Sequence, residues 1–190
     1  MAGFMYRTTD AVIGVSPEVS EVFKDTYRVP AQRLHTIVNG ADLQKFKSAE
    51  KDPHLLSQLN ISNLFTIGMT GNFRTVKNHV LLIQAFSRIN DLFPKTQLVL
   101  VGQGFPNDPE NSEPVIREAI QDNGLSGKVH FLGYRPDVHR ILPCFDIFCL
   151  TSFREGLPLS LLEAMACELP VIGTHVPGIR MVIAHGFNGL

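Results

Sequence analysis

From residue 64 onward, short apolar runs alternate with segments whose apolar residues recur at helical spacing. The runs are short enough to be strands and are apolar on both faces, which is typical of a parallel sheet covered by helices on both sides. The predicted strands cover residues 64–69, 97–101, 129–132, 147–150 and 171–173. The sequence therefore predicts the α/β class, with a doubly wound parallel sheet.

Composition narrows the choice of partners. The chain of 190 residues has a net charge of −1 and an isoelectric point near 6.6, so it carries no basic field for nucleic acid or anionic lipid. Cys144, Cys149 and Cys167 fall within predicted strands or helices and lack metal-site spacing, which is typical of reduced core residues. No apolar run has the length of a signal peptide or a transmembrane helix. We therefore expect a cytoplasmic protein that binds neither nucleic acid nor a metal ion.

Glycine and polar residues gather directly after the predicted strands. These loops are residues 71–77, 102–104, 133–135, 151–156 and 174–178. An open parallel sheet binds its ligands at the edge formed by the carboxyl ends of its strands. Loops of α/β proteins often carry glycine simply as a turn residue, so each loop alone is a weak signal. Their convergence on one edge favours a ligand-binding site.

The segment 153–166 carries two acids, Glu155 and Glu163, on either side of a predicted helix start. Gly156 and Pro158 indicate that start, with Pro158 at the first helical position. Free backbone N–H groups at a helix start bind anions such as phosphate, and carboxylates accept hydrogen bonds from sugar hydroxyls. The order of Glu155, the helix start and Glu163 along the segment therefore matches a sugar, a diphosphate and a ribose. The alternative is that Glu163 is the solvent-exposed edge of a mainly buried helix.

These residues resemble the donor-binding half of retaining glycosyltransferases of the GT-B fold, in particular the "glycosyltransferase group 1", or family 4, enzymes. The resemblance extends over most of the chain, through residues 11–16, 38–42, 71–78, 99–104, 131–133, 153–166, 170–174 and 186–189. It implies a Rossmann-like sheet and an enzyme that transfers a sugar from a nucleotide diphosphate-sugar. The acceptor, whether glycan, lipid or small molecule, is not identified by the sequence. The resemblance also implies a metal-independent reaction without a cofactor.

The resemblance assigns roles by position. Glu155 contacts hydroxyls of the donor sugar and Lys77 neutralises the diphosphate, so these two are the expected catalytic residues. Glu163 holds the ribose hydroxyls, and the loop at residues 134–135 borders the nucleobase. The complete expected donor-binding set is Gly71, Asn72, Arg74, Lys77, Gly102, Tyr134, Arg135, Gly156, Leu157, Pro158 and Glu163.

One position departs from the family's pattern. The family usually has arginine five residues before its lysine, whereas Asn72 stands there and Arg74 follows two residues later. Either Arg74 reaches around the loop to the diphosphate, or it is a solvated loop charge. In the second case Lys77 and the helix start hold the diphosphate alone. In both cases the resemblance implies that the backbone of Gly156 and Leu157 faces the diphosphate.

The sequence also predicts an incomplete protein. Residues 1–33 resemble only the last strand and helix of an N-terminal acceptor domain, and the polar residues 34–63 indicate a linker region with one helical turn. Residues 64–190 form the donor domain, cut short at its C-terminal end. We therefore expect the isolated chain to bind donor without transferring sugar. The full-length enzyme would carry its acceptor site, and any peripheral membrane association, in the missing domain.

Two other functions fit parts of the sequence. A nucleotide- or sugar-phosphate-binding module without transfer activity would use the same loops, since the acceptor half is absent. A Rossmann dehydrogenase would need Gly-x-Gly-x-x-Gly, and residues 102–107 supply only the first two of these glycines. Binding measurements with nucleotides, sugar nucleotides and NAD separate the three functions.

Overall fold

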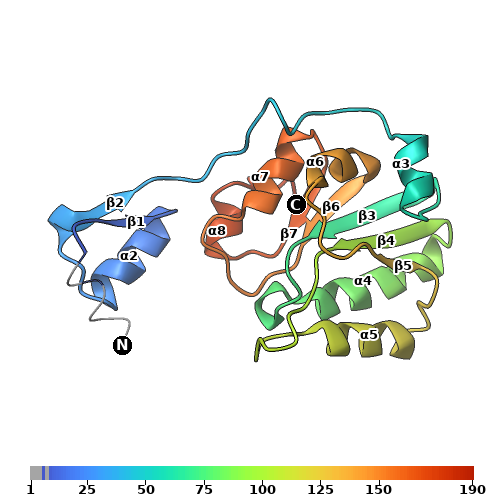
Figure 1. Cartoon of the computed structure of the whole chain (residues 1–190), viewed down its shortest axis with the longest axis horizontal. Helices are drawn as coiled ribbons and strands as arrows, with labels where there is room; N and C mark the ends of the chain where they lie inside the picture. Colours follow the sequence, from blue (N-terminus) through green and yellow to red (C-terminus); the bar gives the residue numbers. More distant parts are fainter. Residues whose placement is uncertain (1–5, 7–8) are drawn as a thin grey trace.

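The computed structural model describes Tyr6 and residues 9–190. Within this range the chain forms a small N-terminal unit and a larger α/β domain, joined by an extended connector (Figure 1). The N-terminal unit contains β1 (Val12–Gly14), α2 (Pro17–Asp25), the 3-10 helix η1 (Ala31–Arg33) and β2 (Leu34–Thr36). The strands of the larger domain are β3 (Phe65–Thr70), β4 (Thr96–Val101), β5 (Val129–Phe131), β6 (Ile147–Leu150) and β7 (Val171–Gly173). Its helices are α3 (Pro53–Gln58), η2 (Thr75–Lys77), α4 (His79–Leu92), α5 (Glu113–Asp122), α6 (Val138–Ile141), η3 (Leu142–Cys144), α7 (Leu159–Ala166) and α8 (Pro177–Arg180).

Within the described residues, the larger domain has one five-stranded parallel sheet in the order β5–β4–β3–β6–β7. The chain passes from β3 outward to β4 and β5, and then returns to the other side of β3 at β6. This reversal creates a topological switch point, and ligands of such sheets bind at the carboxyl ends of the strands there. Figure 1 shows α4 and α5 on one face of the sheet and α6 and α7 on the other. The predicted α/β, Rossmann-like, doubly wound sheet is confirmed.

The core of the larger domain surrounds the inner strands. All six residues of β4 are buried, because helices cover both faces of this strand. In β3 a side chain at Gly68 would overlap the ring of Phe145, so glycine is required at this close approach. Phe86 of α4 and Phe148 of β6 have no exposed surface. Burying each such side chain contributes about 1.5–3 kcal/mol, and this packing holds the strand ends from which the site loops emerge.

The connector contributes to the same core. Helix α3 is the helical turn expected within residues 34–63, and Asp52 caps it by accepting two backbone N–H groups at 2.9 and 3.2 Å. Phe46 and Leu55 belong to the hydrophobic cluster of the sheet and are only 7 % and 1 % exposed. Lys51 adds an ion pair with Asp146 at 2.6 Å. Part of the segment that we expected to be a linker therefore packs into the larger domain.

The N-terminal unit follows its local sequence signals. Ser16 caps α2, since its Oγ accepts the N–H of Val19 at 3.1 Å, and Pro17 occupies the first helical position. Strands β1 and β2 pair in parallel. Val15 and Val19 contact the larger domain at Gly156, where a Cβ would lie 3.1 Å from a methyl group of each valine. The unit therefore packs against the loop that leads into α7.

Candidate functional site

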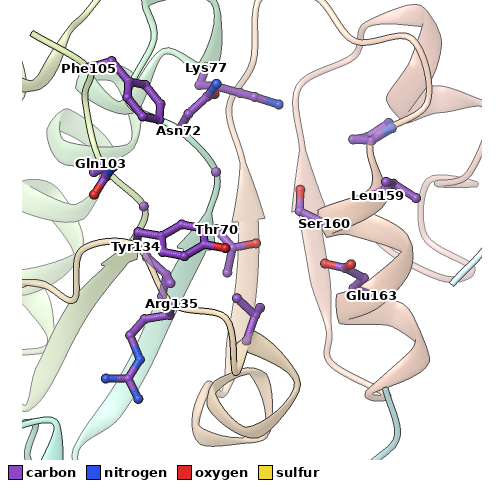
Figure 2. Close-up of a pocket in the computed structure, with 15 residues that line it drawn as sticks. Thr70, Asn72, Lys77, Gln103, Phe105, Tyr134, Arg135, Leu159, Ser160 and Glu163 are labelled. Atoms are coloured by element: carbon purple, nitrogen blue, oxygen red, sulfur yellow. The ribbon is translucent and has the colours of Figure 1, made fainter. Parts of the chain in front are cut away.

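A cavity of about 480 Å³ opens at the carboxyl edge of the sheet. Its walls come from the loops after β3, β4 and β5 and from the start of α7. Figure 2 shows Tyr134 and Arg135 on one side of the cavity and Glu163 on the other. The lining residues are Thr70, Gly71, Asn72, Lys77, Val101, Gly102, Gln103, Phe105, Tyr134, Arg135, Val138, Pro158, Leu159, Ser160 and Glu163.

Two glycines fit the loops after β3 and β4 together. Gly71 donates its N–H to the carbonyl oxygen of Val101 at 2.9 Å. Gly102 has a φ of +145°, and a Cβ at this position would overlap the carbonyl oxygen of Gly71. Two residues after Gly71, Phe73 donates its N–H to the carbonyl oxygen of Gln103 at 2.9 Å. Glycine at position 102 therefore allows the backbones of the two loops to lie side by side at the cavity.

Asn78 turns the chain from the loop after β3 into α4. Its backbone is left-handed, with φ 50° and ψ 48°, a conformation that asparagine tolerates better than most residues. The side chain of Asn78 does not cap α4, because it accepts no helix N–H. Capping side chains normally extend from a residue with extended backbone, which Asn78 does not have. The main-chain carbonyl oxygen of Asn78 instead accepts a hydrogen bond from the Thr151 hydroxyl at 3.0 Å. This bond joins the turn to the loop after β6.

The two expected catalytic residues form an ion pair at one end of the cavity. Lys77 Nζ lies 2.7 Å from Glu155 Oε1, and the two side chains are only 19 % and 10 % exposed. The hydroxyl of Ser152 donates to the same Oε1 at 2.5 Å. Because both side chains are largely shielded from water, their charges attract each other more strongly than a surface pair would. The fold thus brings together two residues that lie 78 positions apart in the sequence.

Helix α7 begins one residue later than predicted. Pro158 has φ −73° and ψ 116°, so it is the N-cap rather than the first helical residue. The N–H groups of Leu161 and Leu162 bond to the carbonyl oxygen of Pro158 at 3.2 and 3.3 Å. Leu159 and Ser160 line the cavity just before these bonds, and N–H groups at this position of a helix have no intrahelical partner. The start of α7 can therefore donate to an anion in the cavity.

Glu163 lies one turn further along α7 and faces the cavity (Figure 2). Burial raises the pKa of its carboxyl group, and the positive charge of Lys45 in the connector partly opposes this effect. The sequence left open whether Glu163 is the solvent-exposed edge of the helix. Its position is instead in the wall of a cavity, where its oxygens can accept hydrogen bonds from ligand hydroxyls.

Tyr134 and Arg135 form the opposite wall. The side chain of Tyr134 is open to a ligand, since the residue is 71 % exposed at the rim. Arg135 donates from Nε and Nη2 to the two carboxylate oxygens of Asp137 at 2.8 and 2.7 Å. These hydrogen bonds hold the pKa of Asp137 below its usual range. The charge of Arg135 is therefore neutralised within its own loop, and of the two side chains Tyr134 is the more available to contact a ligand.

Arg74 lies outside the cavity lining. Its Nε is 2.8 Å from Asp108 Oδ2, and its Nη2 is 3.4 Å from Glu110 Oε2. Thr75 reinforces this link by donating its N–H to the carbonyl oxygen of Glu110 at 2.9 Å. Arg74 therefore tethers the loop after β4 to the loop after β3, whereas Asn72, at the family's arginine position, lines the cavity.

Most of the expected donor-binding residues meet at this cavity. Those in its lining are Gly71, Asn72, Lys77, Gly102, Tyr134, Arg135, Pro158 and Glu163. Those outside the lining are Arg74, Glu155, Gly156 and Leu157. Gly156 is covered by the N-terminal unit, and the Leu157 side chain is buried. Glu155 is connected to the cavity through Lys77.

Sequence reasoning missed several lining residues. They are Thr70, Val101, Gln103, Phe105, Val138, Leu159 and Ser160. Most of them end a strand, follow a glycine of an expected loop or continue the predicted helix start. Gln103, Leu159 and Ser160 lie inside segments that the sequence had singled out, and Thr70, Val101 and Phe105 lie one residue beyond an expected loop. Val138 is the first residue of α6 and carried no such signal.

Tyr6 and residues 9–190 contain no group of three or more His, Cys, Asp and Glu side chains that could hold a metal ion. In the same part of the chain, no helix has both the length and the apolar character needed to span a membrane.

Comparison with protein families identifies one match, to the family described as Glycosyl transferases group 1, over residues 53–190. The N-acetyl-alpha-D-glucosaminyl L-malate synthase of Bacillus anthracis is 40 % identical over 189 residues, which cover 98 % of this chain and 47 % of that protein. The UDP-Gal:alpha-D-GlcNAc-diphosphoundecaprenol alpha-1,3-galactosyltransferase of Escherichia coli is 30 % identical over 191 residues, with coverages of 98 % and 48 %. The chain thus spans about half the length of these relatives.

Solved structures agree with the sequence match. Anabaena Alr3699/HepE in complex with UDP and glucose superposes with a TM-score of 0.86 at 27 % identity, over 97 % of this chain and 50 % of that chain. The complex of HepE with UDP-glucose gives the same TM-score at 25 % identity, over 100 % and 54 % of the two chains. The predicted family resemblance is confirmed: the chain belongs to the Glycosyl transferases group 1 family.

Proposed function

We propose that this chain is the donor-binding half of a retaining glycosyltransferase and that its cavity holds a nucleotide diphosphate-sugar. The observation that carries the proposal is that Lys77 and Glu163, from two different walls, line one cavity at the carboxyl edge of a parallel sheet. A cation and a carboxylate beside a helix start suit a diphosphate and a ribose. The whole protein would transfer the sugar to an acceptor bound by its other half.

The geometry supports one orientation of the donor. The nucleobase lies at the exposed ring of Tyr134, and the ribose hydroxyls donate to Glu163 across the cavity. The diphosphate then lies over the start of α7, where the N–H groups of Leu159 and Ser160 and the ammonium group of Lys77 converge. The sugar continues toward Glu155. A cavity of about 480 Å³ is within the usual range of ligand sites.

The names of similar proteins support uridine nucleotides as the first probes. HepE was crystallised with UDP-glucose, and the E. coli relative is named for UDP-Gal. Screening should also include guanosine and adenosine diphosphates beside UDP.

The proposed reaction places its main demand on the leaving group. Breaking the bond between sugar and diphosphate leaves extra negative charge on the diphosphate, and donors that already point at this charge lower the barrier. Lys77 and the start of α7 are arranged to do this. Their positive charge and N–H dipoles lie at one end of the cavity. The retaining outcome rests on the resemblance of the 153–166 segment to retaining enzymes.

Titration calorimetry with uridine, UDP, UDP-glucose and NAD tests the proposal. UDP should bind to the chain. Lys77→Ala should weaken the binding of UDP and leave the binding of uridine nearly unchanged, because Lys77 acts on the phosphates. Salt should reduce the difference at an open site. Lys95→Ala is the matched control, since Lys95 is an exposed lysine at the amino end of β4. An equal loss of affinity for uridine and for UDP would contradict the assignment of Lys77 to the diphosphate site.

Two further outcomes separate the alternatives. Binding of NAD in preference to every nucleoside diphosphate would favour a dehydrogenase-type module instead. Transfer of sugar by the 190-residue chain alone would contradict its assignment as a donor half, because the acceptor must otherwise come from across a closing cleft. We expect donor binding and no transfer.

A further inference from the structure

We propose that Ser152 is a positioning residue that keeps Glu155 in its binding orientation while Lys77 engages the diphosphate. This inference rests on the proposed function and adds a residue to it. Ser152 lies two positions after β6 and has no exposed surface. Its hydroxyl donates a hydrogen bond to Glu155 Oε1 at 2.5 Å. Ser152 therefore acts on the ligand only through Glu155.

Both donors to Glu155 meet the same oxygen. Lys77 Nζ lies 2.7 Å from Oε1, and the Ser152 hydroxyl donates to that atom as well. Within the part of the chain that the structure describes, this arrangement leaves Oε2 as the oxygen for a ligand. A carboxylate held by one oxygen presents the other in a fixed direction, as binding a specific sugar hydroxyl requires.

The two donors differ in how firmly they are held. Ser152 is fixed by its surroundings, because its carbonyl oxygen accepts the Thr174 hydroxyl at 2.6 Å. The next residue, Phe153, donates its N–H to the carbonyl oxygen of Val76 at 2.8 Å. Lys77, in contrast, carries its ammonium group on a flexible four-carbon chain with three donor hydrogens.

Arrival of a diphosphate therefore affects the two donors differently. The charged phosphates attract the ammonium group of Lys77, which then divides its hydrogen bonds between the ligand and Glu155. The hydroxyl of Ser152 is neutral and held in place, so it stays on Oε1. Ser152 should consequently affect the affinity for ligands that carry a sugar and have almost no effect on the affinity for the bare nucleoside diphosphate.

Variants at Ser152 test this through the ratio of affinities for UDP-glucose and UDP, measured by calorimetry. Ser152→Ala and Ser152→Cys should each lower the ratio about tenfold, the effect of losing one hydrogen bond to a charged group. Ser152→Thr keeps the hydroxyl and should restore the ratio, whatever its effect on stability. Ser112→Ala is the control, because it removes a buried serine hydroxyl that has no partner among the described residues. An unchanged ratio, or an equal loss for both ligands, would overturn the proposal.

A second measurement decides the question without a ligand. In crystals of Lys77→Ala, Glu155 should keep its side-chain orientation, because Ser152 still holds Oε1. In the double variant Lys77→Ala with Ser152→Ala, Glu155 should turn away. The same orientation in both would overturn the proposal. If the unmodified chain binds neither UDP nor UDP-glucose, the proposed function fails for uridine donors, and these two structures still decide the role of Ser152.

Discussion

Asn39 Nδ2 donates a hydrogen bond of 2.8 Å to the main-chain carbonyl oxygen of Leu157, across 118 positions of sequence. Asn39 belongs to the connector, and Leu157 lies between Glu155 and the start of α7. The carbonyl group of Leu157 is therefore bonded to a residue of the connector. Through this bond the connector helps to set the path of the chain into the cavity wall.

Replacing Asn39 with alanine should weaken binding of UDP-glucose about fivefold. The expected loss corresponds to one ordinary hydrogen bond, about 1 kcal/mol, whose removal lets the loop before α7 move. Calorimetry gives the affinity, and a thermal melt checks that the fold is retained. Gln44→Ala, an exposed change on the same connector, is the control. Equal affinities for the two variants would show that the Asn39 bond does not shape the site.

Replacing Glu163 with glutamine should weaken nucleotide binding by about 1.5–3 kcal/mol, the value of a hydrogen bond to a charged group. Its pKa is raised in the folded state, so the folded chain holds this proton more tightly than the unfolded chain does. Stability contributed by Glu163 is therefore present at low pH and falls as pH rises through its unfolded and then its folded pKa.

Glu163→Gln should accordingly be at least as stable as the unmodified chain at pH 7, while it binds UDP less tightly. Denaturant unfolding and calorimetry measure the two effects separately. Glu118→Gln on the exposed surface of α5 is the control and should change neither. If Glu163→Gln loses stability but keeps its affinity, the residue has a structural role and no contact with the ribose.

Acid should destabilise the chain through His79. This residue is only 2 % exposed, and burial together with the positive charge of Lys77 lowers its pKa to about 4. Because the folded pKa lies below the unfolded value of about 6.5, the unfolded chain takes up the proton first as pH falls. Stability should therefore decline between about pH 6.5 and pH 4, by up to about 3 kcal/mol. His130, whose pKa burial also lowers, adds in the same direction.

His79→Leu should remove most of this decline, because a neutral side chain replaces the one that must be protonated. Denaturant unfolding at pH 7 and pH 4.5 measures it, with His185→Gln as the exposed control. A decline of the same size in His79→Leu would assign the acid sensitivity to other groups.

Local signals in the sequence predicted local structure well. A serine followed by a proline is a typical helix start, and Ser16 and Pro17 occupy the N-cap and first helical positions of α2. The alternation of apolar strands and helices predicted the parallel sheet, because both faces of inner strands must be covered. The start of α7 was wrong by one residue, since Pro158 satisfies the fixed φ of a helix but has an extended ψ.

Contacts between distant segments could not be predicted in the same way. Arg74 was considered for the diphosphate because it lies two residues after the family's arginine position, yet its partner Asp108 lies in another loop. Phe46 stands in a polar stretch, and only tertiary packing buries it. Ser152 carries no signal of its own, because a serine near a strand end is ordinary. Such residues acquire their roles from neighbours that the fold supplies.

Two truncations should locate the boundary of the larger domain. Removing residues 1–33 should leave its melting transition and its UDP affinity nearly unchanged, because Phe46 and Asn39 remain. Removing residues 1–52 should lower the melting temperature markedly, since loss of a buried phenylalanine typically costs about 3–5 kcal/mol. Circular dichroism measures both melts, and Phe46→Ala in the complete chain should reproduce much of the second effect. Equal melting temperatures for the two truncations would place the boundary after residue 52.

The three cysteines have a practical consequence for watching this molecule at work. Cys144, Cys149 and Cys167 are all free and buried, and burial raises the pKa of each thiol, that of Cys149 to about 12. Thiols of this kind react slowly with maleimides. A single cysteine introduced by Phe105→Cys, at a half-exposed position on the cavity rim, can therefore carry a fluorescent dye without prior removal of the native cysteines. The emission of that dye would report donor arrival in real time.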